Sequence, residues 1–216
     1  NKIGNAAWSC ADPGLQYDTT INEWHTCPNG GRINASNPCS EYMFLDDTAC
    51  NLASLNLMQF KNEDSTFNTD AFKHAVNLWT LTLEISVLMA QFPSKEIAQN
   101  SYDYRTLGLG FANIGGYLMA SGISYDSVEG RSLCAAISAL MTGVSYATSA
   151  QISKELGCFP KYKNNSTDMM RVIKNHRQAA YGKKNGYNNL SVLPVPLIEK
   201  NCLDNNLLNS ARLAWD

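Results

Sequence analysis

Three residues with reactive or hydrogen-bonding side chains, Asn37, Cys39 and Glu41, are spaced by two in the run Asn37-Pro38-Cys39-Ser40-Glu41. Pro38 fixes its own φ and disfavours a helical conformation at Asn37, so the run is predicted to be extended. Because side chains alternate in an extended chain, the amide, the thiol and the carboxylate would point to one side. These three groups form a candidate active site.

The same residues also have a purely structural interpretation. In that case Cys39 is an inert buried thiol near a turn, Asn37 caps a neighbouring segment and Glu41 faces solvent. The sequence that follows favours the active site, because a second cysteine, Cys50, opens the small and apolar run Cys50–Leu57. This run alternates as expected of a strand buried on at least one face. Such a strand would hold Cys50 beside the loop.

The loop and the strand together resemble the active-site region of ribonucleotide reductases. The upstream runs Asp12–Asn22 and Trp24–Asn29 are most similar to the adenosylcobalamin-dependent class II enzymes. The resemblance extends over most of the chain to Arg212 and is most specific between Asp12 and Leu57. One departure is Ala11, where such enzymes usually have glycine. This difference affects a turn and leaves the reacting groups unchanged.

The resemblance implies a fold. The chain is expected to be a fragment of the ten-stranded α/β barrel of these reductases, with residues 32–45 entering the barrel as a finger loop. The tip of the loop is expected near Cys39, the radical cysteine. All of residues 1–216 would belong to this one catalytic domain. Because complete class II enzymes are several times longer, a preceding half-barrel and a following phosphate-binding portion are expected to be missing.

The resemblance also implies residue roles. Cys39 matches the cysteine whose thiyl radical removes the 3′-hydrogen of a ribonucleotide. Glu41 would accept the 3′-hydroxyl proton, Asn37 would hydrogen-bond the ribose hydroxyls, and Cys50 matches one member of the cysteine pair that is oxidised to a disulfide. The other member is not assigned to any cysteine of this chain. Substrate contacts are expected along the whole loop, from Ser36, Asn37, Pro38, Cys39, Ser40 and Glu41.

The implied function is radical-based reduction of ribonucleoside di- or triphosphates to 2′-deoxyribonucleotides for DNA synthesis. Adenosylcobalamin would be the cofactor and a thioredoxin-type dithiol the reductant, although no residue here identifies a cobalamin ligand. Two alternatives remain open. A class I-type large subunit shares the Asn-x-Cys-x-Glu pattern and needs a separate radical-generating subunit. A catalytically silent nucleotide-binding scaffold is the other.

Composition narrows the remaining function classes. The 216 residues are 44% hydrophobic and 17% charged, as in a soluble globular domain. A net charge of -2 and no basic run longer than Lys183-Lys184 argue against a nucleic-acid polymer as ligand. Polar residues interrupt every apolar stretch, so neither a signal peptide nor a membrane span is predicted. A cytoplasmic location is therefore expected.

Cysteine and histidine spacing gives no metal site. The seven cysteines contain no Cys-x-x-Cys pair, which argues against a secreted disulfide framework and against structural zinc. His25 and Cys27 lie two apart but supply only two ligands. Cys134 and Cys158 have no acid–base partner nearby in the sequence and are interpreted as structural.

The rest of the chain is predicted from periodicity and turn residues. Loop is predicted up to the Asp12-Pro13-Gly14 turn, and Pro28–Gly31 is a second turn. Apolar residues at helical spacing, among them Phe72 and Trp79, predict a core helix. The predicted helices are residues 70–92, the glycine-containing 105–121, 126–156 and 168–181, and the predicted loops are 161–167 and 182–189.

Overall fold

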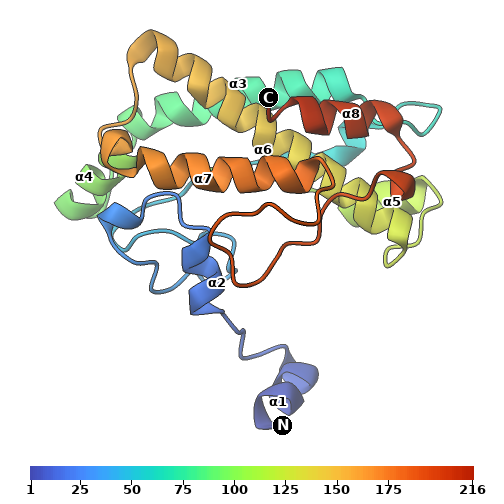
Figure 1. Ribbon diagram of the computed structural model, residues 1–216, viewed down its shortest axis with the longest axis horizontal. Coiled ribbons are helices and arrows are strands. Elements are labelled where there is room, and N and C mark those ends of the chain that lie inside the picture. The colour runs from blue at the N-terminus through green and yellow to red at the C-terminus, as the bar shows by residue number, and fades with distance from the viewer.

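Two parallel strands and eight α-helices make up the computed structural model, which describes residues 1–216 (Figure 1). The strands are β1 (Asn51–Asn56) and β2 (Leu107–Ala112). The α-helices are α1 (Lys2–Cys10), α2 (Asp18–Glu23), α3 (Thr69–Met89), α4 (Lys95–Tyr104), α5 (Ile114–Ala120), α6 (Val128–Leu156), α7 (Tyr162–Ala180) and α8 (Asn205–Leu213). Short 3-10 helices are η1 (Pro28–Gly30), η2 (Leu57–Phe60) and η3 (Glu199–Asn201).

The two strands are joined through α3 and α4, as a parallel pair requires a long crossover connection. Their register runs from Asn51 opposite Leu107 to Asn56 opposite Ala112. Leu55 on one face of β1 belongs to the main core, and on the same face the Asn51 side-chain amide donates to the Leu83 carbonyl of α3 at 2.9 Å. The opposite face of β1 is exposed.

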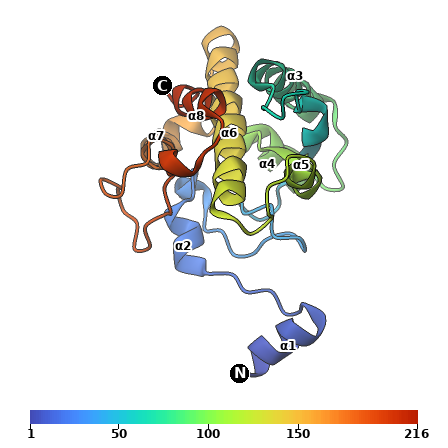
Figure 2. The same ribbon diagram turned by 90° about the vertical axis from the view of Figure 1, so that its right-hand side faces the viewer.

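The main core forms where α6 packs against α3 and α8. In Figure 2, α6 runs through the middle of the molecule, with α3 on one side and α7 and α8 on the other. The rings of Phe60 and Phe67 meet Phe72 of α3 edge-on, each with its centroid 5.0 Å away. α1 has no buried residue and lies apart from this body in both views. The main core is therefore built from residues of β1 and of the elements that follow it.

Both long helices begin where capping chemistry predicts. The Asn68 side chain accepts from the Ala71 amide at the start of α3, and Ser127 accepts from the Gly130 amide at the start of α6. Gly157, at φ 88°, ends α6. Within α3 the predicted core position at Phe72 is confirmed. Trp79 is 43% exposed, so its assignment to the core is wrong.

Three other predictions are wrong. Residues 107–112 are a strand, because they pair in register with β1, and Gly108 lies on the face of β2 where the Cys50 and Leu52 side chains leave no room for a Cβ. Residues 162–167 begin α7 instead of a loop, since the polar Asn165 is buried and hydrogen-bonded there. Lys2–Cys10 forms α1 where a loop was expected.

One helix also departs from the expectation that no apolar stretch is long enough to span a membrane. α6 has 29 residues and is long and apolar enough by length and composition alone. Ten of its residues are buried inside this fold, among them Ile137 and Leu140, which are fully enclosed in the main core. The core helix of a soluble protein passes the same test, so α6 is weak evidence for a membrane.

Candidate functional site

The loop that carries Cys39 is a narrow hairpin closed by a turn. Ser36 and Met43 form an antiparallel bridge, and the Ser40 amide donates to the Asn37 carbonyl at 3.0 Å. Pro38 and Cys39 are the two central residues of this turn. The prediction of a fully extended run is therefore wrong at the tip, because the φ of a proline suits the second position of a β-turn equally well. The predicted position of the tip near Cys39 is confirmed.

The side chains of the hairpin divide between bracing the loop and facing solvent. The Asn37 side-chain oxygen accepts from the Tyr42 amide at 3.0 Å, so this atom closes the hairpin from within. Ser36 donates to the Asn37 carbonyl at 2.8 Å and accepts from the Gln16 side chain. Cys39 is exposed. The side-chain NH₂ of Asn37 and the Cys39 thiol are thus left to meet a ligand.

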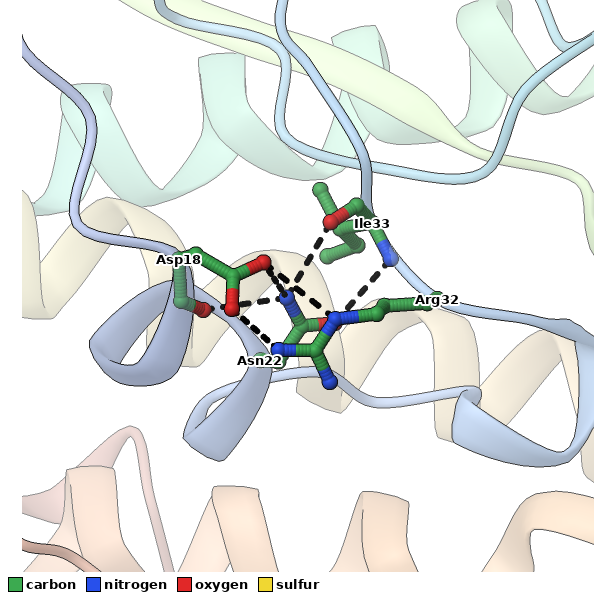
Figure 3. Close-up of polar contacts among 4 residues, drawn as sticks. All are labelled: Asp18, Asn22, Arg32 and Ile33. Atoms are coloured by element: carbon green, nitrogen blue, oxygen red, sulfur yellow. Dashed lines mark hydrogen bonds and ion pairs between the residues drawn. The ribbon is translucent and has the colours of Figure 1, made fainter.

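A separate network fixes the chain where it enters this hairpin (Figure 3). The Asn22 side chain accepts from the Ile33 amide at 3.0 Å and donates to the Ile33 carbonyl at 3.1 Å. The same amide group donates to the Asp18 carbonyl at 3.0 Å, and Arg32 pairs with the Asp18 carboxylate. Ile33 itself is buried. α2 therefore holds the incoming arm of the loop at both backbone groups of one residue.

Tyr42 ties the outgoing arm to the segment before β1 and to the start of β2. Its hydroxyl donates to the Thr48 hydroxyl at 2.8 Å and lies 2.9 Å from the Thr106 hydroxyl. Thr106 in turn donates to the Ala49 carbonyl at 3.3 Å, next to Cys50. Burial raises the pKa of Tyr42, so the hydroxyl stays protonated. Sequence reasoning missed Tyr42, although its place directly after Glu41 was a signal.

Cys50 lies half-buried at the start of β1, within electrostatic reach of Glu41. Burial, and after it the negative charge of Glu41, raises the pKa of the Cys50 thiol to about 11. At neutral pH the thiolate fraction is then on the order of 10⁻⁴, so Cys50 is a proton-carrying thiol. Of the four predicted catalytic residues, Glu41 and Cys50 lie near enough for the charge of one to act on the thiol of the other.

A cavity of about 670 Å³ opens beside the hairpin, between the 24–44 segment, α3 and α6. Glu41 and Tyr42 line it, together with the ion pair between Arg105 and Glu84. Asn37, Cys39 and Cys50 are not among its lining residues. Of the predicted site residues, only Glu41 lines this cavity.

Residues 1–210 match the family model described as the barrel domain of ribonucleotide reductase. The chain belongs to the ribonucleotide reductase family. Proteins named vitamin B12-dependent ribonucleotide reductase in Agrobacterium fabrum and Bradyrhizobium diazoefficiens are each 61% identical over all 216 residues. The protein of the same name in Rhodopirellula baltica is 51% identical over 179 residues, 83% of this chain. The chain spans 17% of the length of each of these three relatives.

This match confirms the family resemblance that the loop and β1 predicted. It also confirms a barrel-domain segment of mixed helix and strand, in which the reductase hairpin at 36–43 precedes β1. The two described strands account for part of a sheet. The family's radical cysteine, base and reducing cysteine are matched in sequence by Cys39, Glu41 and Cys50, and their roles here are proposals.

Cobalamin brings its own ligands to cobalt, so a protein histidine is an optional metal ligand, although histidine is the commonest metal ligand in proteins. Both ring nitrogens of the buried His25 face backbone groups, at 3.1 and 3.3 Å. The ring of His176 lies against those of Trp24 and Trp215, with centroids 4.7 and 5.3 Å away, and burial lowers its pKa to about 4. His74 is exposed on α3. His25 and His176 are therefore held by contacts within the protein, and no histidine here is singled out as a cobalt ligand.

The effect of the Glu41 charge on Cys50 predicts a measurable change in thiol reactivity. In Glu41→Gln the loss of a negative charge should lower the pKa of Cys50, so Cys50 should be alkylated faster at every pH below about 11. Iodoacetamide labelling across pH 7–11, with each cysteine followed by mass spectrometry, measures this change. Glu155→Gln, on the exposed end of α6, is the control and should leave the rate unaltered. Equal alkylation rates of Cys50 in wild type and Glu41→Gln would contradict the electrostatic effect of Glu41.

Proposed function

We propose that this chain is part of the catalytic barrel of a class II ribonucleotide reductase. The reaction is the replacement of the 2′-hydroxyl of a ribonucleoside di- or triphosphate by hydrogen. Two thiols supply two electrons and two protons, so the products are a 2′-deoxyribonucleotide, a disulfide and water. The observation that carries the proposal is the family match over residues 1–210, in a segment whose hairpin presents an exposed Cys39 at its tip. The negative charge of Glu41, which helps to raise the pKa of the half-buried Cys50 thiol, supports it.

In this proposal Cys39 is the hydrogen-abstracting residue. Its place at the tip of a braced turn leaves the sulfur open to a bound ribose. Glu41 accepts the 3′-hydroxyl proton, for which a carboxylate within hydrogen-bond reach is the required geometry. Asn37 donates its free NH₂ to the ribose hydroxyls, while its oxygen holds the loop. Ser36, Pro38 and Ser40 complete the substrate-binding loop.

Cys50 is the proposed reducing thiol and proton donor. Because burial and Glu41 keep the pKa of its thiol near 11, it carries a proton that can be given to the departing 2′-hydroxyl. Its sulfur then bonds to a second cysteine, which we do not assign within residues 1–216. A thioredoxin-type dithiol would reduce the resulting disulfide by thiol exchange.

The ten-stranded barrel and the finger loop are the finer part of the fold proposal. β1 and β2 form a two-stranded sheet, and each has one edge without a strand partner. Relatives about six times longer than this chain have the length to supply the remaining strands. We propose that other parts of the same polypeptide complete the barrel around residues 32–45. For the same reason we propose that the phosphate-binding portion lies outside residues 1–216.

Adenosylcobalamin is the proposed cofactor, supported by the printed names of the relatives. When bound, it would supply the radical that Cys39 requires. No residue described here identifies a cobalamin ligand, and we propose that other parts of the polypeptide contribute to holding the cofactor. A cytoplasmic location is proposed, because seven free cysteines suit a reducing compartment.

An assay of the full-length protein with and without adenosylcobalamin tests this function. Deoxyribonucleotide formation from nucleoside di- and triphosphates, with a dithiol as reductant, is expected only when the cofactor is added. Activity that instead depends on a second protein subunit would favour the class I alternative. Nucleotide binding without reduction under every condition would favour the silent scaffold.

A further inference from the structure

Gly108, in the second strand, lies directly against the Cys50 thiol. A Cβ atom placed on Gly108 would be 2.5 Å from the Cys50 sulfur and 2.5 Å from Cδ2 of Leu52. It would also be 3.2 Å from the Asn51 carbonyl oxygen. Real Cβ atoms essentially never approach another heavy atom within 3.0 Å. The Cys50 sulfur can therefore occupy its observed position only because residue 108 is a glycine without a Cβ atom.

The three neighbours differ in how easily they can move. Leu52 is 61% exposed and its Cδ2 ends a flexible side chain, so it can rotate into solvent. The Asn51 oxygen needs to shift by only a few tenths of an ångström. The sulfur of Cys50 moves only by rotation about χ1, and the side chain is half-buried at the start of a paired strand. Cys50 is therefore the group that a side chain at position 108 would displace.

The position of this sulfur is demanding because disulfide geometry is narrow. The two Cβ atoms of a disulfide lie about 3.5–4.5 Å apart, with the dihedral angle about the S–S bond near ±90°. If the Cys50 side chain turns to another χ1 rotamer, its sulfur points away from a partner cysteine that is placed to bond with the original rotamer. An error of about 1 Å in a reacting group costs roughly 10²-fold in rate.

We propose that Gly108 is a positioning residue for the Cys50 thiol, leaving the space in which this sulfur can form and reopen a disulfide. The contact between Gly108 and the Cys50 sulfur follows from the geometry of β1 and β2. Its effect on catalysis rests on the proposed function. Gly110 supplies a matched comparison two residues along the same strand. A Cβ there would lie 3.7 Å from the Ser54 hydroxyl, an ordinary contact.

The first test follows stability and does not depend on activity. In the full-length protein, Gly108→Ala should lower the midpoint of urea unfolding. Most of this shift should vanish when Cys50→Ala removes the sulfur, and it should persist when Leu52→Ala removes the flexible neighbour. Gly110→Ala should give a shift independent of Cys50. An equal shift for Gly108→Ala with and without the Cys50 sulfur would overturn the proposal.

The second test separates positioning from substrate binding. Gly108→Ala should lower kcat by about 10- to 100-fold with KM for the nucleotide nearly unchanged, because the thiol and not the ribose site is displaced. Gly110→Ala should retain kcat. If Gly108→Ala does not fold, Gly108→Ala/Cys50→Ala should still fold, and its failure to do so would refute the inference. A wild-type protein without reductase activity would refute the proposed function and leave the stability test intact.

Discussion

Replacing Cys39 by serine in the full-length reductase is expected to abolish deoxyribonucleotide formation. Oxygen and sulfur differ little in size, but an alkoxyl radical is much harder to form than a thiyl radical. Because the essential reacting atom is lost, turnover should fall by on the order of 10⁴-fold or more. Nucleotide affinity should stay nearly constant, since the turn is held by backbone groups and by Asn37 and not by the sulfur.

Turnover measured with radiolabelled nucleotide, together with binding measured by equilibrium dialysis, checks this expectation. The matched control is Cys134→Ser, a half-buried cysteine in α6 with no proposed role. Its turnover should remain close to wild type. Retained turnover in Cys39→Ser would refute the assignment of the radical to this residue. Loss of nucleotide binding in the same variant would instead show that the turn itself had changed.

Much of the fold was predictable where local signals and packing agree. α3 and α6 begin at Asn68 and Ser127, side chains that accept the first free amide groups of a helix. β1 followed from alternation. The start of α7 was not predictable, because the hydrogen-bond partners of its buried polar residue Asn165 include a residue far away in the sequence. Asn165 is 1% exposed, accepts from the Asn29 amide at 2.9 Å and donates to the Lys161 carbonyl at 3.0 Å.

β2 shows a different limit of sequence reasoning. Gly108 and Gly110 are two apart, which suits one face of a strand as well as a glycine-rich helix. The decision between them depends on β1, a partner more than fifty residues earlier in the chain. Only the paired structure shows that the absent side chain at Gly108 makes room for Cys50. A tertiary contact therefore overrides the local pattern here.

The candidate site was predictable in its residue types and less so in its geometry. The spacing of Asn37, Cys39 and Glu41 suggested one shared direction, but the hydrogen bond that closes the turn between Asn37 and Ser40 breaks the alternation. The negative charge of Glu41 acts instead on the Cys50 thiol, whose pKa it helps to raise. Cys39 lies exposed at the tip of the turn, whereas Cys50 is half-buried just before β1. We infer that a bound substrate links the chemistry of Cys39 to that of Glu41 and Cys50.

That arrangement gives Cys50→Ser a distinct expected phenotype. Serine cannot form a disulfide, so continuous deoxyribonucleotide production should fall by on the order of 10³-fold or more, as when a reacting group is removed. Cys39 is intact in this variant, and removal of the 3′-hydrogen should still occur. The variant should therefore release label from 3′-tritiated nucleotide in at most a single abortive event per active site.

The comparison with Cys39→Ser makes this prediction decisive. Cys39→Ser should release no tritium, because the hydrogen-abstracting atom is missing, whereas Cys50→Ser should release it without forming deoxyribonucleotide. Single-turnover measurements with 3′-tritiated substrate, followed by chromatography of the products, separate the two cases. Sustained turnover of Cys50→Ser with an external dithiol would refute its place in the reducing pair. In that event Cys50 would be structural, and both reducing thiols would have to lie elsewhere in the polypeptide.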